Sequence, residues 1–373
     1  MSEIHLFIIW EKAQIEREHI LSDLFDKFNV KMIKNIKWRD ENFSKNLTRF
    51  YGFKLPPNSN KEKHCGKGFF TLVVVEDILP FYGMKKTSSG IEKLNINIFD
   101  KKTLYRSWTG GGHKIHATNN ILESKQDLML LTGLTLEEAK LYPNLEIQSS
   151  LSTDVFKEDL IGTNGYKNFE ELLKLMNQTC NYVILRNFEK YPEEYYNPIH
   201  NDIDLLVENL EHVRKMTNSK PSLKQKYRVR DEIVIDNKVV YFDLRHIGDD
   251  YYSEEFQKKI LSNKIFYKDL MYIPSNEDYF YSLIYHALIH KKEIKDDYWK
   301  RINDFRGVLK SDKEELSKLL NKYMKKNEYL FTEPKDLSVY YNLEFTPHNN
   351  YSKIRMAFNY YNSFKQLVKR IIK

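Results

Sequence analysis

The chain has 373 residues, 41% of them hydrophobic and 30% charged, a length that allows two hydrophobic cores and a composition that excludes a disordered protein. Its net charge of +7, from 59 basic and 52 acidic residues, is not concentrated in a basic patch or joined by an aromatic stacking platform, so we expect no nucleic-acid partner. Its two cysteines, Cys65 and Cys180, lack metal-ligand spacing and favour a reducing, cytoplasmic location.

The first half of the chain predicts alternating strands and helices. Residues 69–75 (FFTLVVV) are a continuous run typical of a buried strand, and residues 94–99 (LNINIF) alternate as an amphipathic strand does. Thr135 and Glu138 form the capping-box pattern of a helix start. In chain order we predict strands at 4–10, 30–38, 69–75 and 94–99, and helices at 13–28, 123–131 and 135–141.

Periodicity lapses over residues 143–165, where Ser, Thr, Asn and Gly accumulate, so we place a domain boundary there. The sequence therefore predicts an α/β (α+β) protein, with a mixed α/β domain at 1–150 and a sheet domain with a helical C-terminal lobe at 165–373. In the second domain we predict helices at 169–178 and 210–216, strands at 182–185, 202–207, 232–235 and 239–244, and helices beyond Pro274.

Three aspartates in the second domain predict a metal site. Asp202 and Asp204, in the segment HNDIDLLV, lie two apart in one strand, so their side chains point to the same face. Asp243, in VVYFDLR, is flanked by strand-forming residues and would join the pair from a neighbouring strand. Close carboxylates repel one another and are tolerated best around a divalent cation, here Mg²⁺ or Mn²⁺. Alternatively, Asp202 and Asp204 are solvated and Asp243 pairs with Arg245 or a lysine.

The order of helix, strand, loop, D-x-D strand and later strand with a third Asp resembles the polymerase-β-type nucleotidyltransferase superfamily, over the second domain only. The resemblance implies Mg²⁺-dependent transfer of a nucleotidyl or phosphoryl group from a nucleotide to a small or carbohydrate-linked acceptor, as in bacterial surface polysaccharide (capsule) biosynthesis. Members usually have Gly-Ser or Gly-Gly after the first strand, whereas this chain has Arg186 and Asn187. Arg186 is therefore a candidate phosphate ligand, and Arg245 and His246 are candidate substrate ligands.

Two other functions stay open. A sugar-nucleotide glycosyltransferase also uses a D-x-D pair with Mg²⁺ or Mn²⁺, although in those enzymes the pair usually ends a hydrophobic strand and here it begins one. A kinase with its catalytic site in the first domain is the other alternative.

The segment YRSWTGGGHKIHATNN is the candidate phosphate-binding loop of the first domain, which we expect to join a strand to a helix. Its candidate ligands are Gly110, Gly111, Gly112, His113 and Lys114. It resembles the Gly-Gly-x-His-Arg turn of sulfiredoxins and ParB-type proteins, a fold that includes small-molecule kinases. We expect Glu76 and Asp77, at the end of the buried strand, to lie opposite it. Alternatively, the glycines serve turn geometry alone.

Two further patterns occur near the C-terminus. His286 and His290 lie four apart on a predicted helix, which allows a shared metal but more simply predicts polar groups lining a cleft. Residues 353–373 predict a basic amphipathic helix, which either packs on the protein or contacts an anionic membrane peripherally.

Overall fold

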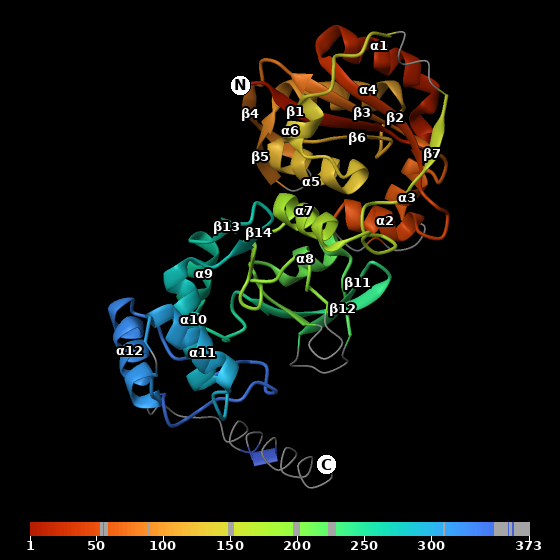
Figure 1. Ribbon diagram of the computed structural model, residues 1–373. Coiled ribbons are helices and arrows are strands. Elements are labelled where there is room, and N and C mark those ends of the chain that lie inside the picture. The colour runs from red at the N-terminus through yellow and green to blue at the C-terminus, as the bar shows by residue number, and fades with distance from the viewer. Residues whose placement is uncertain are drawn as a thin grey trace. The chain divides into compact units, whose positions relative to one another are not determined.

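The computed structural model describes residues 1–52, 55, 59–87, 90–147, 153–196, 202–222, 229–308, 310–346, 357, 360 and 361. Contacts divide the chain into two compact units, Met1–Tyr166 (unit 1) and Lys167–Lys373 (unit 2). Each unit contains a mixed sheet of five strands, and helices follow the second sheet (Figure 1). The predicted mixed α/β class with a helical C-terminal region is thus confirmed.

Unit 1 interleaves its strands. In its sheet the order is β6-β1-β3-β2-β7, and β3 is antiparallel to both β1 and β2, so the β1-α1-β2 connection passes over β3 in a split β-α-β arrangement. Its elements are β1 (Glu3–Ile9), the 3-10 helix η1 (Glu11–Glu16), α1 (Arg17–Lys27), β2 (Asn29–Lys37), α2 (Phe43–Phe50), α3 (Asn60–Cys65), β3 (Phe70–Asp77), β4 (Tyr82–Thr87), β5 (Gly90–Asn95), α4 (Ile96–Trp108), β6 (Ile115–Ala117), α5 (Ile121–Thr132), α6 (Leu136–Lys140) and β7 (Val155–Lys157).

The core of unit 1 lies on both faces of its sheet. Every residue of β3 is buried, as its unbroken β-branched run predicts. Figure 1 shows α1 and α4 on one side of the sheet and α5 and α6 on the other. On the side of α1 and α4, apolar residues of the strands pack against the two helices, among them Phe7, Ile9, Val73, Val75, Ile20, Leu24, Ile98 and Tyr105.

The outer edge of the unit 1 sheet is covered by side chains of α4. β6 is the terminal strand, so the backbone groups on its outer side have no strand partner among the residues that the structure describes. Arg106 Nε donates to Ile115 O at 3.1 Å, and Lys102 Nζ donates to Ala117 O at 3.1 Å. Because Lys102 and Arg106 lie four apart on one helical face, α4 holds β6 at two points on either side of His116.

The predicted strand at 94–99 is wrong beyond its first two residues. β5 ends at Asn95 and α4 begins at Ile96, with the Asn95 side chain accepting a hydrogen bond from the Ile98 amide at 3.3 Å. Asn is a strong helix N-cap, and this signal outweighs the short alternation of apolar residues. The capping box at Thr135 and Glu138 is confirmed at the start of α6.

Unit 2 is built on a sheet of order β10-β11-β12-β9-β8, in which β9 and β12 are parallel and the other neighbours antiparallel. Its elements are α7 (Phe169–Thr179), β8 (Tyr182–Ile184), β9 (Asp202–Val207), α8 (Leu210–Thr217), β10 (Lys220–Pro221), β11 (Arg230–Ile235), β12 (Lys238–His246), α9 (Glu254–Ser262), β13 (Ile265–Tyr267), β14 (Met271–Ile273), α10 (Asn276–Ile289), α11 (Asp296–Arg306) and α12 (Lys313–Lys326).

The helical C-terminal region packs on one face of the unit 2 sheet. Val183, Leu185 and Leu206 join a hydrophobic cluster with buried residues of α9, α10 and α12. The prediction of helix from Pro274 onward holds for α10, α11 and α12 but is wrong for residues 329–346, which contain no helix. There Asp336 accepts from the Ser338 amide at 2.9 Å, a local turn that competes with helix, and Tyr341 is buried in the cluster.

The predicted amphipathic segment 353–373 lies outside the described residues, except for Ala357, Tyr360 and Tyr361. Among the helices that the structure does describe, none has both the length and the apolar character needed to cross a bilayer.

Candidate functional site

The three predicted metal ligands of unit 2 meet on one face of its sheet. β9 and β12 pair in parallel with Asp204 opposite Asp243 and Asp202 opposite Tyr241. Paired residues on neighbouring strands lie about 4.8 Å apart and point to the same face, as do residues two apart in one strand. Asp202 is exposed, Asp243 is half-buried and Asp204 is buried. We call these three residues the aspartate cluster.

Arg186 holds the buried member of the cluster. Its Nε and Nη2 atoms donate to the two carboxylate oxygens of Asp204, at 2.9 and 2.6 Å, and both side chains are buried. Such a two-point pair fixes the orientation of the carboxylate as well as its charge. Burial raises the pKa of Asp204, an effect that Asp243 and Asp202 increase and Arg186 opposes.

Asn187 provides the backbone turn that follows β8. Its φ is 65°, in the left-handed region that favours glycine and that Asn tolerates better than other residues. Its Nδ2 also lies 3.3 Å from Asp204 Oδ2. The residue directly after Arg186 therefore has a backbone conformation that glycine adopts without strain.

Arg245 forms an ion pair with Asp243, as Arg186 does with Asp204. Its Nη2 donates to the Asp243 oxygens at 2.9 and 3.2 Å, and its Nη1 donates to Asp336 Oδ2 at 3.0 Å. The guanidinium carbon also lies 4.4 Å from the centre of the Tyr251 ring. The ion pair with Arg245 that the sequence left as an alternative for Asp243 is therefore present, on the same face as the aspartate cluster.

Opposite charges thus offset the repulsion expected within the aspartate cluster. Lys291 is a third cation that interacts electrostatically with the aspartate cluster. Burial lowers the pKa of Lys291, Arg186 lowers it further, and Asp204 and Asp243 raise it. Sequence patterns missed Asn187, Lys291 and Asp336. Asn187 was visible only as a residue replacing glycine, and Asp336 lies 91 positions from its partner Arg245, beyond any periodic signal.

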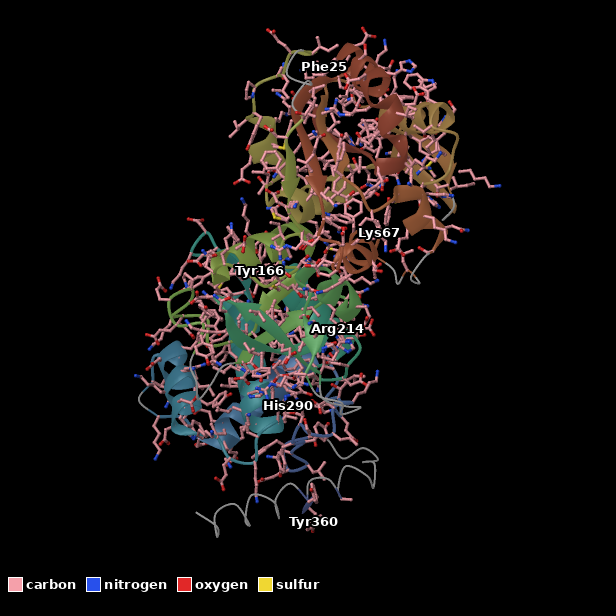
Figure 2. The ribbon with its side chains drawn as sticks, turned by 90° about the vertical axis from the view of Figure 1, so that its right-hand side faces the viewer. Phe25, Lys67, Tyr166, Arg214, His290 and Tyr360 are labelled. Atoms are coloured by element: carbon pink, nitrogen blue, oxygen red, sulfur yellow. The ribbon has the colours of Figure 1, made fainter. Side chains whose placement is uncertain are left out.

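The predicted histidines are not all part of this face. His246 follows Arg245 in β12, so strand alternation turns it to the opposite face, and its Nδ1 lies 3.0 Å from Ile247 O. His286 Nδ1 lies 2.5 Å from the Tyr251 hydroxyl and its Nε2 lies 3.1 Å from the Tyr298 hydroxyl. His290, labelled in Figure 2, is buried with its ring 4.1 Å from that of Tyr251. Both histidines of the pair therefore lie in the packed interior.

The glycine segment of unit 1 lies at the end of a helix. It joins α4 to β6, which corrects the expected strand-to-helix connection. Gly110, Gly111 and Gly112 all have φ between 75° and 80°. The amides of Gly110 and Gly111 donate to Ser107 O and Arg106 O, at 3.4 and 2.7 Å. These bonds close the C-terminus of α4, the electronegative end of the helix, which disfavours an anion.

The side chains beside the glycines have local partners. Lys114 Nζ donates to Thr109 O in the same turn. The His113 amide lies 3.4 Å from His64 Nδ1, and the two imidazole rings are 5.6 Å apart. Of the two alternatives for this segment, the geometry favours turn formation over a backbone cradle for phosphate.

Glu76 and Asp77 do not lie opposite the glycine segment, contrary to the prediction. Glu76 pairs with Ile4 near the start of β1, whereas Lys114 bonds the Trp10 amide beyond its end, so Glu76 and Asp77 lie at the far end of the sheet. Glu76 instead forms an ion pair with Lys31 at 3.1 Å.

A second cluster joins His116, the middle residue of β6, to Glu123 and Asp127 of α5. Among the described residues it is the one group of metal-ligating side chains whose three donor atoms all lie within 4.8 Å of one another, a criterion that the aspartate cluster does not meet. His116 Nε2 lies 2.8 Å from Asp127 Oδ2. Burial lowers the pKa of His116 to about 3 and raises the pKa of both Glu123 and Asp127.

We predict that Asp204→Asn lowers the free energy of unfolding by about 3–5 kcal/mol, because it leaves the buried guanidinium of Arg186 without its counter-charge. Urea unfolding of the full chain measures the change. The double variant Asp204→Asn, Arg186→Met should recover much of the loss, since the buried charge is removed as well. Additive losses in the double variant would show that the two side chains are not energetically coupled.

We predict that Gly111→Val destabilises the protein by about 1–2 kcal/mol, because a β-branched residue is strained in the left-handed region, whereas Gly111→Asn is nearly neutral. Urea unfolding checks the stability, and titration with inorganic phosphate checks binding. A Gly111→Val variant with native stability and reduced phosphate affinity would contradict this and support a phosphate-binding loop.

We predict that His286 makes the protein sensitive to acid. Burial, together with the charge of Arg186, lowers the pKa of His286 well below its ordinary 6.5. As the pH falls below 6.5 only the unfolded chain gains the proton, so stability present at higher pH is lost, by about 2 kcal/mol at pH 5. Urea unfolding at pH 8 and pH 5 should therefore show a smaller pH effect in His286→Gln than in wild type. Equal pH effects would exclude a neutral, buried His286.

Comparison of the chain with models of known protein families, with curated proteins and with solved structures finds no match.

Proposed function

We propose that unit 2 is a Mg²⁺-dependent nucleotidyl- or phosphoryl-transferase that acts on a small or carbohydrate-linked acceptor. The observation that supports this most directly is the register of β9 and β12, which gathers Asp202, Asp204 and Asp243 on one face. Three carboxylates on adjacent strands are an oxygen donor set of the kind that Mg²⁺ takes in nucleotide-processing enzymes.

The donor set fits Mg²⁺, although the arrangement of the charges limits which oxygens are available. Both oxygens of Asp204 accept hydrogen bonds from Arg186, and both oxygens of Asp243 accept them from Arg245, whereas Asp202 is exposed. Asp202 and the half-buried Asp243 would therefore provide most of the coordination, with Asp243 shared between the ion and Arg245 and Asp204 between the ion and Arg186. Bound Mg²⁺ would neutralise phosphate charge and polarise the phosphorus–oxygen bond that is broken.

The cations around the aspartates suit the phosphates of a nucleotide. Arg186 and Arg245 each present a planar group of donors, and Lys291 lies within the same field. In the absence of ligand these groups balance the carboxylates. When a metal ion binds the carboxylates, the same guanidinium groups gain an alternative partner in the incoming phosphate oxygens.

The structure gives less support to the two alternatives, a sugar-nucleotide glycosyltransferase and a kinase with its site in unit 1. β9 begins at Asp202, so the D-x-D pair starts its strand, whereas in D-x-D glycosyltransferases the pair usually ends one. A kinase site at the glycine segment of unit 1 loses support because the Gly110 and Gly111 amides close the end of α4. The proposed setting, cytoplasmic synthesis of a surface polysaccharide, rests on the resemblance to nucleotidyltransferases alone.

We predict that nucleoside triphosphates stabilise the wild-type protein only in the presence of Mg²⁺, and that Asp202→Asn abolishes this effect. A ligand at 100 times its dissociation constant adds about 2.7 kcal/mol of stability, which thermal denaturation detects readily. Asp202 suits the experiment because it is exposed, so its replacement should leave the fold intact.

Asp236→Asn is the matched control. Asp236 is also an exposed carboxylate of unit 2, in the turn between β11 and β12, and Asn tolerates its positive φ of 49°. This variant should respond to Mg²⁺ and nucleotide as the wild type does. Stabilisation by a UDP-sugar with Mn²⁺, but by no nucleoside triphosphate, would replace the proposal with a glycosyltransferase, and equal responses of the two variants would exclude Asp202 from the site.

A further inference from the structure

We propose that His116, Glu123 and Asp127 of unit 1 form a site for a divalent transition-metal ion, separate from the aspartate cluster of unit 2. The site depends on the positions of one imidazole on β6 and two carboxylates on α5. It is independent of the proposed transferase function, because every ligand belongs to the other unit of the chain.

The distances suit one ion. The three donor atoms all lie within 4.8 Å of one another, and His116 Nε2 and Asp127 Oδ2 are 2.8 Å apart. Ligand atoms about 2.0–2.2 Å from a zinc-like ion are necessarily within roughly 4.4 Å of each other, so small side-chain movements would be sufficient. Three protein ligands leave coordination positions open for water or another small ligand.

One ligand is held by β6 and two are held by α5. Glu123 and Asp127 lie four apart on α5 and therefore share a helical face. Glu123 Oε2 accepts from the Asn119 amide at 2.6 Å, which leaves its second oxygen for another contact. The His116 ring is packed edge-on by Phe50 and Tyr51, with centroid distances of 5.1 and 5.6 Å. The imidazole therefore has little freedom to turn away from α5.

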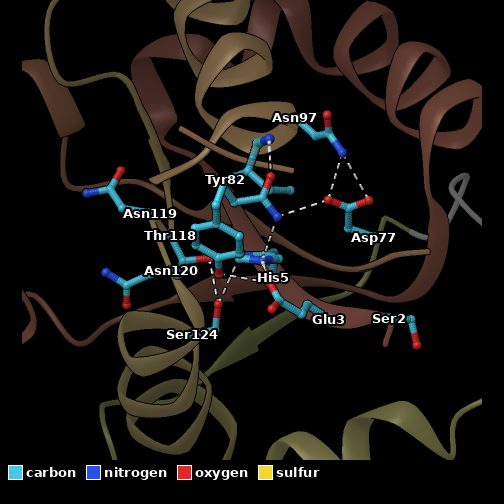
Figure 3. A network of polar contacts seen from close by, with 12 residues as sticks. Ser2, Glu3, His5, Asp77, Tyr82, Asn97, Thr118, Asn119, Asn120 and Ser124 are labelled. Carbon is cyan, nitrogen blue, oxygen red and sulfur yellow. Dashed lines mark hydrogen bonds and ion pairs between the residues drawn. The ribbon is translucent and has the colours of Figure 1, made fainter. Parts of the chain in front are cut away.

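A buried polar network fixes α5 against the strands. Figure 3 shows His5 of β1 beside Thr118 and Ser124, which lie between His116 and Asp127 in the sequence. His5 Nδ1 is 3.0 Å from Thr118 Oγ1 and 3.1 Å from Ser124 Oγ, and the two hydroxyl oxygens are 2.8 Å apart. All three side chains are buried. This network sets the distance between the helix and β6, and so sets the distance between the ligands.

Nearby cations determine which ion the cluster prefers. Lys102 and Arg106 donate to the β6 carbonyls rather than lying in open solvent, and their charge weakens the attraction of any cation. The positive charges of Lys102 and Arg106 reduce the affinity most for an ion that is bound by charge alone, such as Mg²⁺ or Ca²⁺. An ion that also gains from an imidazole nitrogen, such as Zn²⁺ or Co²⁺, retains that part of its affinity.

The experiment titrates the metal-free full chain with Co²⁺ in the presence of excess Mg²⁺. The Mg²⁺ occupies sites made of oxygen ligands only, so the titration measures the site that contains an imidazole nitrogen. We expect one Co²⁺ per chain, with visible absorption bands, and Zn²⁺ should displace it. His116→Gln and Asp127→Asn should each weaken binding by more than about 100-fold, beyond the effect of losing an outer-shell partner. No stoichiometric Co²⁺ or Zn²⁺ binding by the wild type overturns the proposal.

His113→Gln is the matched control, because His113 lies on the same segment but outside the cluster, and it should bind Co²⁺ as the wild type does. An equal loss in His113→Gln and His116→Gln overturns the ligand assignment. Should the His116 variant fail to fold, X-ray absorption of the Zn²⁺-loaded wild type decides the matter. It should show one imidazole nitrogen at about 2.0–2.1 Å with oxygen ligands, and a shell without nitrogen overturns the proposal.

Discussion

The parallel register between β9 and β12 determines which side chains of unit 2 share a face of the sheet. Side chains alternate along a strand, so a slip of one residue would turn Asp243 and Arg245 to the opposite face of the sheet. In the observed register Asp204 lies opposite Asp243, and the same face receives the packing of the C-terminal helices through Leu206. The apolar half of the face thus fixes the position of the charged half, because the hydrophobic cluster would be lost with the slip.

The aspartate cluster of unit 2 and the His116, Glu123 and Asp127 cluster of unit 1 both lie near cations, but the contacts differ. In unit 2, Arg186 and Arg245 contact Asp204 and Asp243 directly, so orientation and charge balance come from the same bonds. In unit 1, Lys102 donates to backbone and amide oxygens while Asp127 contacts His116. Because Asp204 and Asp243 are paired directly with arginines, removing the charge of either carboxylate alone leaves a cation without its partner. Asp127 instead contacts the imidazole of His116.

The sequence was sufficient for features that depend on local pattern. The strand that carries the D-x-D pair (β9), the buried run of β3 and the capping box of α6 follow from residues within a few positions of one another. Features that depend on residues far apart in the chain could not be predicted from the sequence. The pairing of Arg245 with Asp336 and the approach of His116 to α5 are set by packing. At Asn95 two local signals conflicted, and the helix cap outweighed strand alternation because α4 also buries Ile98 and Tyr105.

The two side chains that hold β6 also affect how the protein behaves at high concentration. An edge strand with unbonded carbonyls is a template on which another chain can add a strand. Lys102 and Arg106 use the Ile115 and Ala117 carbonyls and place charged side chains along that edge. At the opposite edge, β7 has only three residues and ends in Lys157. Neither border of the unit 1 sheet therefore offers a long, uncharged strand, and resistance to intermolecular sheet growth follows from the same contacts that position His116.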